Sequence, residues 1–468
     1  MFITKYPTHL DPELVQIIKT IHLGGGKAYI VGGFIRDLVL EKPISASYGY
    51  DIEVYHIQPE PLQIILKTFG QVNDVGKSFG VFKLTTALRT YDVSLPRKDN
   101  KVSSGHRGFS VDISNSLSIS EACKRRDFTM NSMLYDIETQ EIIDPFHGLK
   151  DIDNKVIRHV SESFSEDPLR VLRAMQFSAR FEFSIHPTTI SLCRSIDLNE
   201  LPKERLFEEF KKLFLLAEKP SLGIVVADEL EALKYFPEIL SLHGVQQDPE
   251  WHPEGDVFIH TLMVIDEAAQ LRSGEEFSDL CLMYGSLCHD FGKPLTTQFI
   301  NGKFRSHAHD VAGIKPTKSF LARLTKDKDL IDTISTLVKE HLQPALLYKA
   351  RHEVSDGAIR RLSLRVEIPL LLKVAQADHF GRFTTLLKRP DSFEAGEWLF
   401  LRWKQLQSPD SHLKPLLKGS HLMRLGVLPG PMMGKIIQKS FEQQLDGQIL
   451  NEEEAVTWAV DYLKSSAQ

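Results

Sequence analysis

The chain has 468 residues, of which 42% are hydrophobic and 25% are charged, and its formal net charge is −6. This length predicts several domains, and the composition is that of an ordinary globular protein. The charge excludes a polycation, so a nucleic-acid partner would need a local basic surface. The stretches KRRD and RVLRAMQFSAR, residues 124–127 and 170–180, are candidates for such a surface.

The cysteines and the hydropathy pattern indicate the compartment. Four scattered cysteines without a CxxC pair favour a reducing compartment over a disulfide scaffold. The N-terminal stretch MFITKYPTHLDPEL has no signal-peptide pattern, and no run approaches 18 uninterrupted apolar residues. We therefore expect a cytoplasmic protein without a membrane partner.

Residues 27–95 alternate between strand-like and helix-like patterns. KAYIVGG predicts a strand that ends at a glycine pair, FIRDLVLE a helix, YDIEVYHI a second strand and EPLQIILKTFG a second helix. GVFKLTTA and RTYDVSLPR predict a further pair of strands. The pattern is typical of a mixed α/β domain, and the polar, basic residues 97–110 predict a flexible loop.

The strand signal fades after about residue 115. MLYDIETQEIIDPF predicts a hairpin, and beyond residue 160 nearly every apolar pattern has helical spacing. A linker is expected at 406–415, before a last helical segment that is interrupted by LPGP at 428–431. We expect this tail to pack as a helical cap.

Glycines and acids in the α/β part suggest phosphoryl-transfer chemistry. Gly32 and Gly33 lie where a strand turns into a helix, so backbone N–H groups can approach a phosphate, and Arg36 lies one turn further on. Asp51 and Glu53 share one face of the next strand. With Asp92 on a later strand, these carboxylates suit a two-metal site for phosphoryl transfer.

Histidine and aspartate recur at ordered positions in the helical part. Such side chains are ligands for a mixed nitrogen and oxygen metal site, and a metal ion there can generate hydroxide for phosphoester hydrolysis. The candidate residues are His260, His289, Asp290, His307, His309, Asp310, His341 and Asp378.

The motifs GGFIRD, KRRDFTMNSMLYD, IIDPFHGLKDI and SEDPLRVLRAMQFSARF occur in this order. Together they resemble the bacterial class II tRNA nucleotidyltransferase (CCA-adding enzyme) and poly(A) polymerase family, over residues 27 to about 240. The resemblance places Gly32, Gly33 and Arg36 beside a triphosphate. It assigns nucleotide contacts in the same pocket to Arg126, Asp127, Asn131, Asp167, Arg170 and Arg173.

Asp167 and Arg170 are expected to read the base. We predict that they lie three residues apart on one helix and share a face. A carboxylate accepts from an exocyclic amine and a guanidinium donates to a ring nitrogen, so the pair selects cytosine and adenine over guanine and uracil without a template.

One position departs from the family pattern. The family shows D-x-D, and alignment through DIEVY places Asp51 at the second aspartate and Gly49 at the first. Two interpretations follow. Either Glu53 replaces the lost ligand together with Asp51 and Asp92, or the transferase is impaired and another part of the chain carries the function.

The histidine pattern resembles the HD phosphohydrolase superfamily, and WHPEGDVFIHTL resembles the HD domain that follows the transferase in some bacterial CCA-adding enzymes. By that resemblance, a first metal ion is held by His260, His289, Asp290 and Asp378. His309 and His341 would hold a second ion, with Lys293 near a phosphate.

The sequence therefore predicts an α/β nucleotidyltransferase domain with a mixed β-sheet, followed by mostly α-helical domains that include an HD-type domain. The expected parts are a palm-like domain (1–150), a helical base- and RNA-binding domain (151–245), an HD phosphohydrolase domain (246–400) and a helical tail (401–468).

The predicted function is addition or repair of the 3′-CCA end of tRNA from CTP and ATP, with Mg²⁺ at Asp51, Glu53 and Asp92. The HD domain is expected to hydrolyse phosphoesters at RNA ends with a divalent transition metal such as Ni²⁺, Mn²⁺ or Zn²⁺. The alternatives are a poly(A) polymerase, and an HD phosphohydrolase whose degenerate transferase domain only senses nucleotides.

Overall fold

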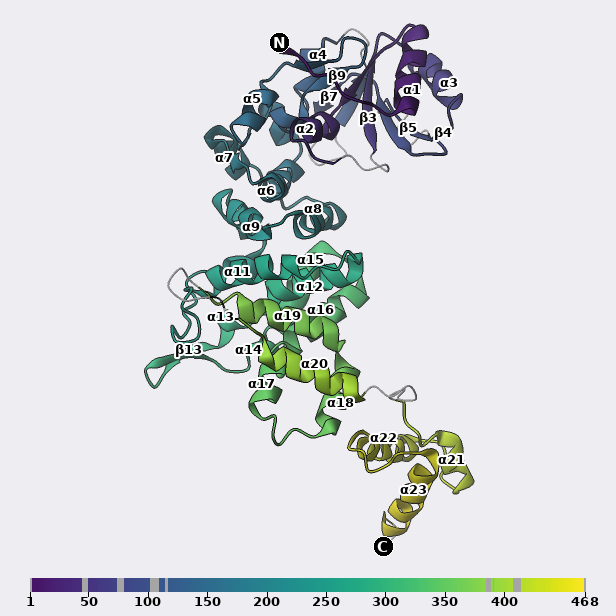
Figure 1. Cartoon of the computed structure of the whole chain (residues 1–468), viewed down its shortest axis with the longest axis vertical. Helices are drawn as coiled ribbons and strands as arrows, with labels where there is room; N and C mark the ends of the chain where they lie inside the picture. The colour runs from purple at the N-terminus through teal and green to yellow at the C-terminus, as the bar shows by residue number, and fades with distance from the viewer. Residues whose placement is uncertain are drawn as a thin grey trace. The chain divides into compact units, whose positions relative to one another are not determined.

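The computed structural model describes residues 2–43, 49–73, 80–101, 109–113, 117–383, 389, 391–406 and 414–466. The chain divides into two compact units, each described here by itself (Figure 1). The first comprises Met1–Ala217 and Leu222–Tyr235, and the second comprises Glu218–Ser221 and Phe236–Gln468. The predicted boundaries near 150, 245 and 400 divide the chain more finely and stay predictions.

A mixed β-sheet organises the first unit, as the sequence predicted. Within the described residues it has eight strands in the order β1-β10-β9-β2-β3-β6-β5-β4. They are β1 (Phe2–Lys5), β2 (Lys27–Val31), β3 (Tyr50–Tyr55), β4 (Gln71–Asn73), β5 (Val81–Thr85), β6 (Thr90–Ser94), β9 (Leu134–Asp136) and β10 (Glu141–Asp144). The pair β3 and β6 is parallel, whereas the other neighbours are antiparallel.

Helices and short strands surround this sheet. Helices α1 and α3 pack against each other and against sheet strands. The helices of the first unit are α1 (Pro12–Leu23), α2 (Gly33–Val39), α3 (Pro59–Lys67), α4 (Ile119–Cys123), η2 (Thr129–Asn131), α5 (Gly148–Asp153), η3 (Glu162–Glu166), α6 (Leu169–Phe181), α7 (Pro187–Arg194), α8 (Lys203–Leu216), α9 (Pro220–Glu229) and η4 (Ala232–Tyr235). Strands β11 (Val156–Ile157) and β12 (Ser184–Ile185) form a small parallel pair.

The prediction of a flexible loop at 97–110 is wrong at both of its ends. β7 (Arg97–Lys101) and β8 (Phe109–Ile113) form an antiparallel pair, with Arg97 opposite Ile113. The polar and basic residues of this stretch favoured a loop, but backbone pairing between two strands does not require apolar side chains. Residues 102–108, in the middle of the predicted loop, lie outside the described residues.

The second unit is helical except for one hairpin. Its helices are α10 (Pro237–Leu240), α11 (Val257–Gln270), α12 (Glu276–Cys288), α13 (Lys293–Thr296), α14 (His309–Ala312), α15 (Ile314–Leu324), α16 (Lys328–Glu340), α17 (Gln343–Lys349), α18 (Asp356–Arg365), α19 (Ile368–Phe380), α20 (Glu394–Leu406), α21 (Gly419–Arg424), α22 (Pro431–Leu445) and α23 (Glu452–Ser466). The sequence did not predict the hairpin of β13 (Thr297–Ile300) and β14 (Lys303–Ser306). Within the described residues, no helix is both long and apolar enough to cross a membrane.

The C-terminal helices α21, α22 and α23 share a small apolar core. Leu422, Ile436 and Ala459 are buried in it. Arg361 on α18 forms ion pairs with Glu442 on α22, at 2.7 Å, and with Asp446, which directly follows α22, at 2.8 Å. The LPGP break falls between α21 and α22, so the tail packs as interrupted helices. The predicted linker at 406–415 lies largely outside the described residues.

Candidate active sites in the two units

The glycine turn brings the strand β3 carboxylate close to the start of helix α2. Gly32 has φ +75°, a conformation that favours glycine. A Cβ atom at Gly32 would lie 3.1 Å from Oδ2 of Asp51 and would crowd that carboxylate. The turn therefore leaves room for Asp51 beside the N-terminus of the helix.

Asp51 and Asp92 form an acidic pair on neighbouring strands. Strands β3 and β6 run parallel with Asp51 in register with Asp92. Both side chains reach solvent, but the surrounding protein removes much of the hydration of Asp51. This desolvation, with the repulsion of Asp92, raises the pKa of Asp51 to about 6. Two such carboxylates are ligands that a hard divalent cation favours.

Glu53 lies on the same strand but has different neighbours. Its side chain is fully buried and forms an ion pair with Arg126, while Arg125 lies 3.6 Å away. Burial alone would raise the pKa of Glu53, but the charges of Arg126 and Arg125 outweigh it and lower that pKa. Metal binding by Glu53 stays a prediction, and it would require the carboxylate to leave both arginines.

A pocket of about 460 Å³ opens beside Asp51. The pocket is lined by every predicted nucleotide-binding residue, and these come from three separate stretches of sequence: Gly32, Gly33, Arg36, Arg126, Asp127, Asn131, Asp167, Arg170 and Arg173. Glu53 and Asp92 are not among its lining residues. The pocket is also lined by residues that were not predicted to bind the nucleotide, namely Arg125, Leu169, Gln176, Phe177, Arg180, Arg205 and Lys212. Arg125 and Arg180 belong to the two basic stretches noted above, whereas no sequence signal marks Arg205.

A chain of hydrogen bonds holds the pocket's polar side chains. Arg36 donates to Oδ1 of Asn131 at 2.8 Å, and Asn131 donates to Oδ1 of Asp127 at 3.1 Å. Arg173 donates from Nε to Oδ2 of Asp127 at 2.8 Å. Burial would raise the pKa of Asp127, but Arg173 and these hydrogen bonds lower it, so the carboxylate stays ionised. The chain fixes two arginines in the wall of the pocket.

Asp167 and Arg170 line the same pocket, but the prediction that both lie on one helix is wrong. Asp167 has an extended backbone and precedes Pro168, and helix α6 begins at Leu169. A residue before proline avoids the helical conformation, which explains the difference. Asp167 instead pairs with Arg205 through both carboxylate oxygens, at 2.8 and 3.1 Å. Arg170 donates to the carbonyl of Ser163 at 2.6 Å.

The pocket carries an excess of positive charge. Its lining contains seven arginines and one lysine but three aspartates, Asp51, Asp127 and Asp167. Guanidinium groups bind phosphate oxygens in pairs. A polyanion such as a triphosphate therefore fits this pocket, which Asp51 also lines.

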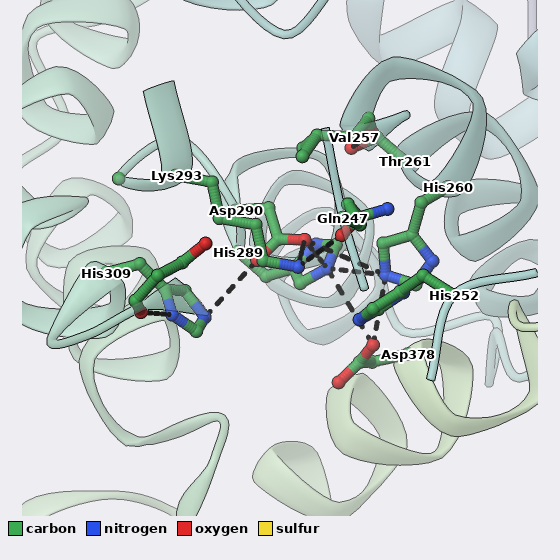
Figure 2. A network of polar contacts seen from close by, with 12 residues as sticks. Gln247, His252, Val257, His260, Thr261, His289, Asp290, Lys293, His309 and Asp378 are labelled. Carbon is green, nitrogen blue, oxygen red and sulfur yellow. Dashed lines mark hydrogen bonds and ion pairs between the residues drawn. The ribbon is translucent and has the colours of Figure 1, made fainter. Parts of the chain in front are cut away.

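Six of the eight predicted histidines and aspartates of the second unit are buried and lie together, and Figure 2 labels five of them, whereas His307 is exposed and Asp310 is only partly buried. Helix α11 supplies His260, and His289 and Asp290 follow the end of α12. Helices α14 and α19 supply His309 and Asp378, and His341 directly follows α16. Elements far apart in sequence thus bring all six side chains together.

The six side chains form two groups, each able to hold an ion. One contains His260, His289 and Asp378, and the other contains Asp290, His309 and His341. In the first group Nε2 of His260 lies 3.1 Å from Oδ1 of Asp378 and 3.2 Å from Nε2 of His289. Ring nitrogens and a carboxylate that meet this closely fit a shared cation.

The orientation of three histidines supports metal binding. Nδ1 of His289, His309 and His341 contacts the backbone carbonyls of Ser286, Ser306 and Val338, at 2.7, 2.8 and 2.6 Å. A ring that donates from Nδ1 keeps Nε2 as an acceptor, so each ring presents a lone pair toward the centre.

Asp290 lies between the two groups. Its Oδ2 is 3.2 Å from Nε2 of His289, and its Oδ1 is 3.3 Å from Nε2 of His309. Lys293 contacts Oδ2 at 2.6 Å, and within the described residues neither oxygen accepts a hydrogen bond of good geometry. A buried carboxylate without such bonds suits a ligand that bridges two ions.

Other polar residues contact this centre, and the sequence did not predict a role for them. Glu254 contacts Nδ1 of His260 at 2.8 Å and Nδ1 of His252 at 2.9 Å. Arg382 pairs with Asp378 at 2.6 Å. His252 and Glu254 lie in the WHPEGD stretch, and their His-x-Glu spacing could have indicated them from the sequence. His307 lines the adjacent pocket but belongs to neither group.

A glycine turn, an acidic strand and an arginine-lined pocket define a nucleotidyltransferase head, and the second unit has the centre of an HD metal domain. Family models agree. Residues 28–158 match the poly A polymerase head domain, 182–242 a probable RNA- and SrmB-binding site of polymerase A, and 257–382 the HD domain. Both the nucleotidyltransferase and the HD families depend on metal ions.

The chain belongs to the family of multifunctional CCA proteins. It is 32% identical over 430 residues to the one from Xanthomonas axonopodis pv. citri, covering 88% of this chain and 97% of that protein. The one from Mannheimia succiniciproducens is 35% identical over 306 residues, which cover 64% and 70% of the two chains.

Solved structures agree with the fold. A Bacillus stearothermophilus CCA-adding enzyme in complex with CTP has a TM-score of 0.67 at 21% identity, covering 98% of this chain and 99% of that one. A Thermotoga maritima CCA-adding enzyme complexed with tRNA has a TM-score of 0.57 at 20% identity, covering 97% and 96%.

Proposed function

We propose that this chain adds or repairs the 3′-CCA end of tRNA from CTP and ATP. The observation that carries the proposal is the arginine-lined pocket, because the predicted nucleotide-binding residues of three stretches of sequence meet there beside Asp51. Membership of the multifunctional CCA family favours this function over that of a poly(A) polymerase. Maturation of tRNA ends and four free, buried cysteines also favour the cytoplasm as its compartment.

In this proposal each part of the pocket has its own task. Arg36, Arg126 and Arg173 bind the phosphates and sugar of the incoming nucleotide. Asp51 and Asp92 would hold Mg²⁺, and a divalent cation there would supply the charge stabilisation that attack of the RNA 3′ hydroxyl on the α-phosphate and release of pyrophosphate require. The ion pair with Glu53 keeps Arg126 directed toward the pocket. In the alternative role, Glu53 binds the metal ion and gives up this ion pair.

Base selection rests on Asp167 and Arg170. The carboxylate accepts from the exocyclic amine that cytosine and adenine share, and the guanidinium donates to the neighbouring ring nitrogen. The ion pair with Arg205 orients the Asp167 carboxylate in the pocket wall. The exocyclic amine of the incoming base then donates to the same carboxylate that accepts from Arg205.

We also propose that the second unit hydrolyses 2′,3′-cyclic phosphates or phosphomonoesters at RNA ends. His260, His289 and Asp378 would hold one ion, and His309 and His341 a second. Asp290, expected from the sequence on the first ion, groups with His309 and His341, and its Oδ2 also lies 3.2 Å from Nε2 of His289. The nitrogen-rich set favours Mn²⁺, Ni²⁺ or Zn²⁺. Bound ions supply a hydroxide nucleophile at neutral pH. Lys293 and Arg382 provide positive charge near the phosphate. Such hydrolysis frees the terminal hydroxyl that the transferase needs.

The test uses the full chain with tRNA lacking CCA, labelled CTP and ATP, and Mg²⁺. We expect two CMP additions followed by one AMP. Extension with ATP alone beyond one residue would instead indicate a poly(A) polymerase. Absence of all transfer, with phosphohydrolase activity retained, would indicate a degenerate, nucleotide-sensing head.

A further inference from the structure

A second pocket, of about 300 Å³, lies in front of the metal-binding groups of the second unit. Asp290, His309, His341 and Asp378 line one part of it. Trp251 and Phe304 line another part, although neither is a possible metal ligand. The pocket therefore combines a polar, metal-binding region with an aromatic wall.

The aromatic wall is exposed. Trp251 is 60% exposed, so the indole is available to a ligand and is not part of the core. An exposed indole in a pocket wall offers a large flat surface for an apolar ring at little conformational cost. Phe304 is half-buried and packs against Phe299 across the hairpin in a tilted arrangement, with ring centroids 5.0 Å apart.

Ion pairs hold the two aromatic segments together. Lys303, next to Phe304 on β14, contacts Glu250 at 2.5 Å and Asp248 at 3.8 Å. Glu250 directly precedes Trp251 in the sequence. The 248–251 turn and the β13–β14 hairpin, labelled at β13 in Figure 1, thus border one pocket.

Positive charge also lines this pocket. Lys293, Arg305 and Arg382 line the pocket. Lys293 and Arg382 pair with Asp290 and Asp378. Among the described residues, the exposed Arg305 has no ion-pair partner. A ligand that fits has an anionic group for the cations and a flat ring for Trp251.

We propose that this pocket binds a nucleoside phosphate, with the phosphate toward the metal-binding groups and the base stacked on Trp251 and Phe304. The inference deepens the proposed phosphohydrolase function and rests on it. Its volume suits about one nucleotide, so the bound group is the terminal nucleotide of an RNA strand. Stacking on aromatic side chains tolerates every base, so the site accepts all four terminal nucleotides.

The kinetic test compares substrates with and without a base, on the full chain loaded with Mn²⁺. Trp251→Ala and Phe304→Ala should each raise KM for adenosine 2′-monophosphate about 5-fold to 100-fold, the usual effect of losing one stacking partner. Hydrolysis of glycerol 2-phosphate, which has no base, should not change. Trp251→Phe should retain most of the nucleotide affinity, and adenosine, cytidine and uridine phosphates should differ by only a few-fold.

Phe277→Ala is the matched control. Phe277 is an exposed aromatic residue of the same unit, and it does not line the pocket. Its removal should change neither substrate's KM. An equal effect of Trp251→Ala on both substrates would show that the indole acts only on folding, and no effect on either would also overturn the stacking site.

A binding measurement separates this inference from the proposed hydrolysis. Calorimetry with adenosine 2′-monophosphate would use an Arg126→Ala, Arg173→Ala background to remove nucleotide binding in the first unit. Binding that Trp251→Ala weakens supports the stacking site even if the chain hydrolyses nothing, in which case only the phosphohydrolase function fails. Binding that is unaffected by Trp251→Ala contradicts the stacking site whatever the hydrolysis result.

Discussion

At the residue scale, Gly49 decides how many carboxylates the transferase site offers. Asp51 and Asp92 lie in register, whereas Glu53 is buried against arginines. A side chain at Gly49 would meet few obstacles, because the nearest atom to a Cβ there is the carbonyl oxygen of Thr90 at 3.9 Å. The position can therefore accept an aspartate without rearrangement.

We predict that Gly49→Asp increases the kcat of CMP addition. The new carboxylate lies two residues before Asp51, on the same side of the strand, and would add a metal ligand, which should raise the rate about 10-fold to 100-fold. Steady-state kinetics with CCA-less tRNA measure this change, and Gly49→Asn is the control of equal size. Equal rates in the unsubstituted protein, Gly49→Asp and Gly49→Asn would contradict the prediction, because the existing carboxylates would then bind the metal ions as well as three do.

Glu53 has two candidate roles, and one substitution separates them. If Glu53 positions Arg126, Glu53→Gln should raise KM for CTP and ATP about 10-fold, because a buried charge-assisted bond is weakened, while the Mg²⁺ dependence stays unchanged. If Glu53 is a metal ligand, the variant should instead need more Mg²⁺, as Asp51→Asn should. Titration of activity against Mg²⁺ at saturating nucleotide distinguishes the two.

The pKa of Asp51 predicts a pH dependence. Burial and the charge of Asp92 raise this pKa to about 6, so the carboxyl is neutral below pH 6 and ionised above it. Protons then compete with the cation, and apparent Mg²⁺ affinity should fall as the pH decreases through about 6. Asp92→Asn removes the repulsion, so the midpoint should move to lower pH while the maximum rate falls. An unchanged midpoint in this variant would mean that another group titrates.

At the element scale, Gly292 determines how closely two metal-binding segments approach. A Cβ there would lie 1.9 Å from the carbonyl oxygen of His309, which is backbone and cannot rotate away. Gly292→Ala should displace α14, cost about 1–3 kcal/mol of unfolding free energy, and lower the metal content of the second unit. Metal analysis after dialysis and urea unfolding measure both effects.

Gly434 provides the matched substitution. It lies in α22, and nothing lies within 4 Å of a Cβ atom at this position. Gly434→Ala should leave metal content unchanged and stabilise the helix by about 0.5–1 kcal/mol. Loss of metal in both variants would show that the effect of Gly292→Ala does not come from its contact with His309.

Elements with strong local signals could be predicted from the sequence. The glycine turn after β2, the β5–β6 strand pair and the β9–β10 hairpin have alternating or punctuated patterns, and the structure contains each of them. No residue of β13 or β14 is buried, so no hydrophobic period marks that hairpin. The polar and basic composition of residues 97–108 favoured a loop over the β7–β8 pair. Asp167 was misplaced because Pro168, and not the charge spacing, sets the start of α6.

The residues of the candidate sites were likewise predictable only where a sequence motif marks them. Histidines, aspartates and arginines in recognisable motifs were predicted, and the structure brings them together. Arg205 and Trp251 were not. Arg205 lies in a segment without a motif, and Trp251 begins the WHPEGDVFIHTL motif but has none of the side-chain types that bind metals, so only the fold shows that each lines a pocket.

At the scale of the whole molecule, the two sites lie in separate compact units, each with its own core. We therefore predict that the two activities can be removed one at a time. Asp290→Asn should abolish phosphoester hydrolysis and leave CMP addition within about twofold, and Asp51→Asn should do the reverse, because substitutions at sites that share no partner residues act independently. Parallel assays on the same preparations measure this, and loss of both activities in either variant would reveal coupling.

The division of the chain also affects how the protein is made. Residues 222–235 complete the first unit although 218–221 belong to the second. Leu230 and Leu233 are almost fully buried, and a Cβ atom at Gly223 would lie 3.1 Å from the carbonyl oxygen of Met175. A nascent chain released only to residue 217 would lack these contacts. The catalytic head therefore cannot finish folding on the ribosome until residue 235 has emerged, and a proteolytic cut at 217 would not yield an intact head.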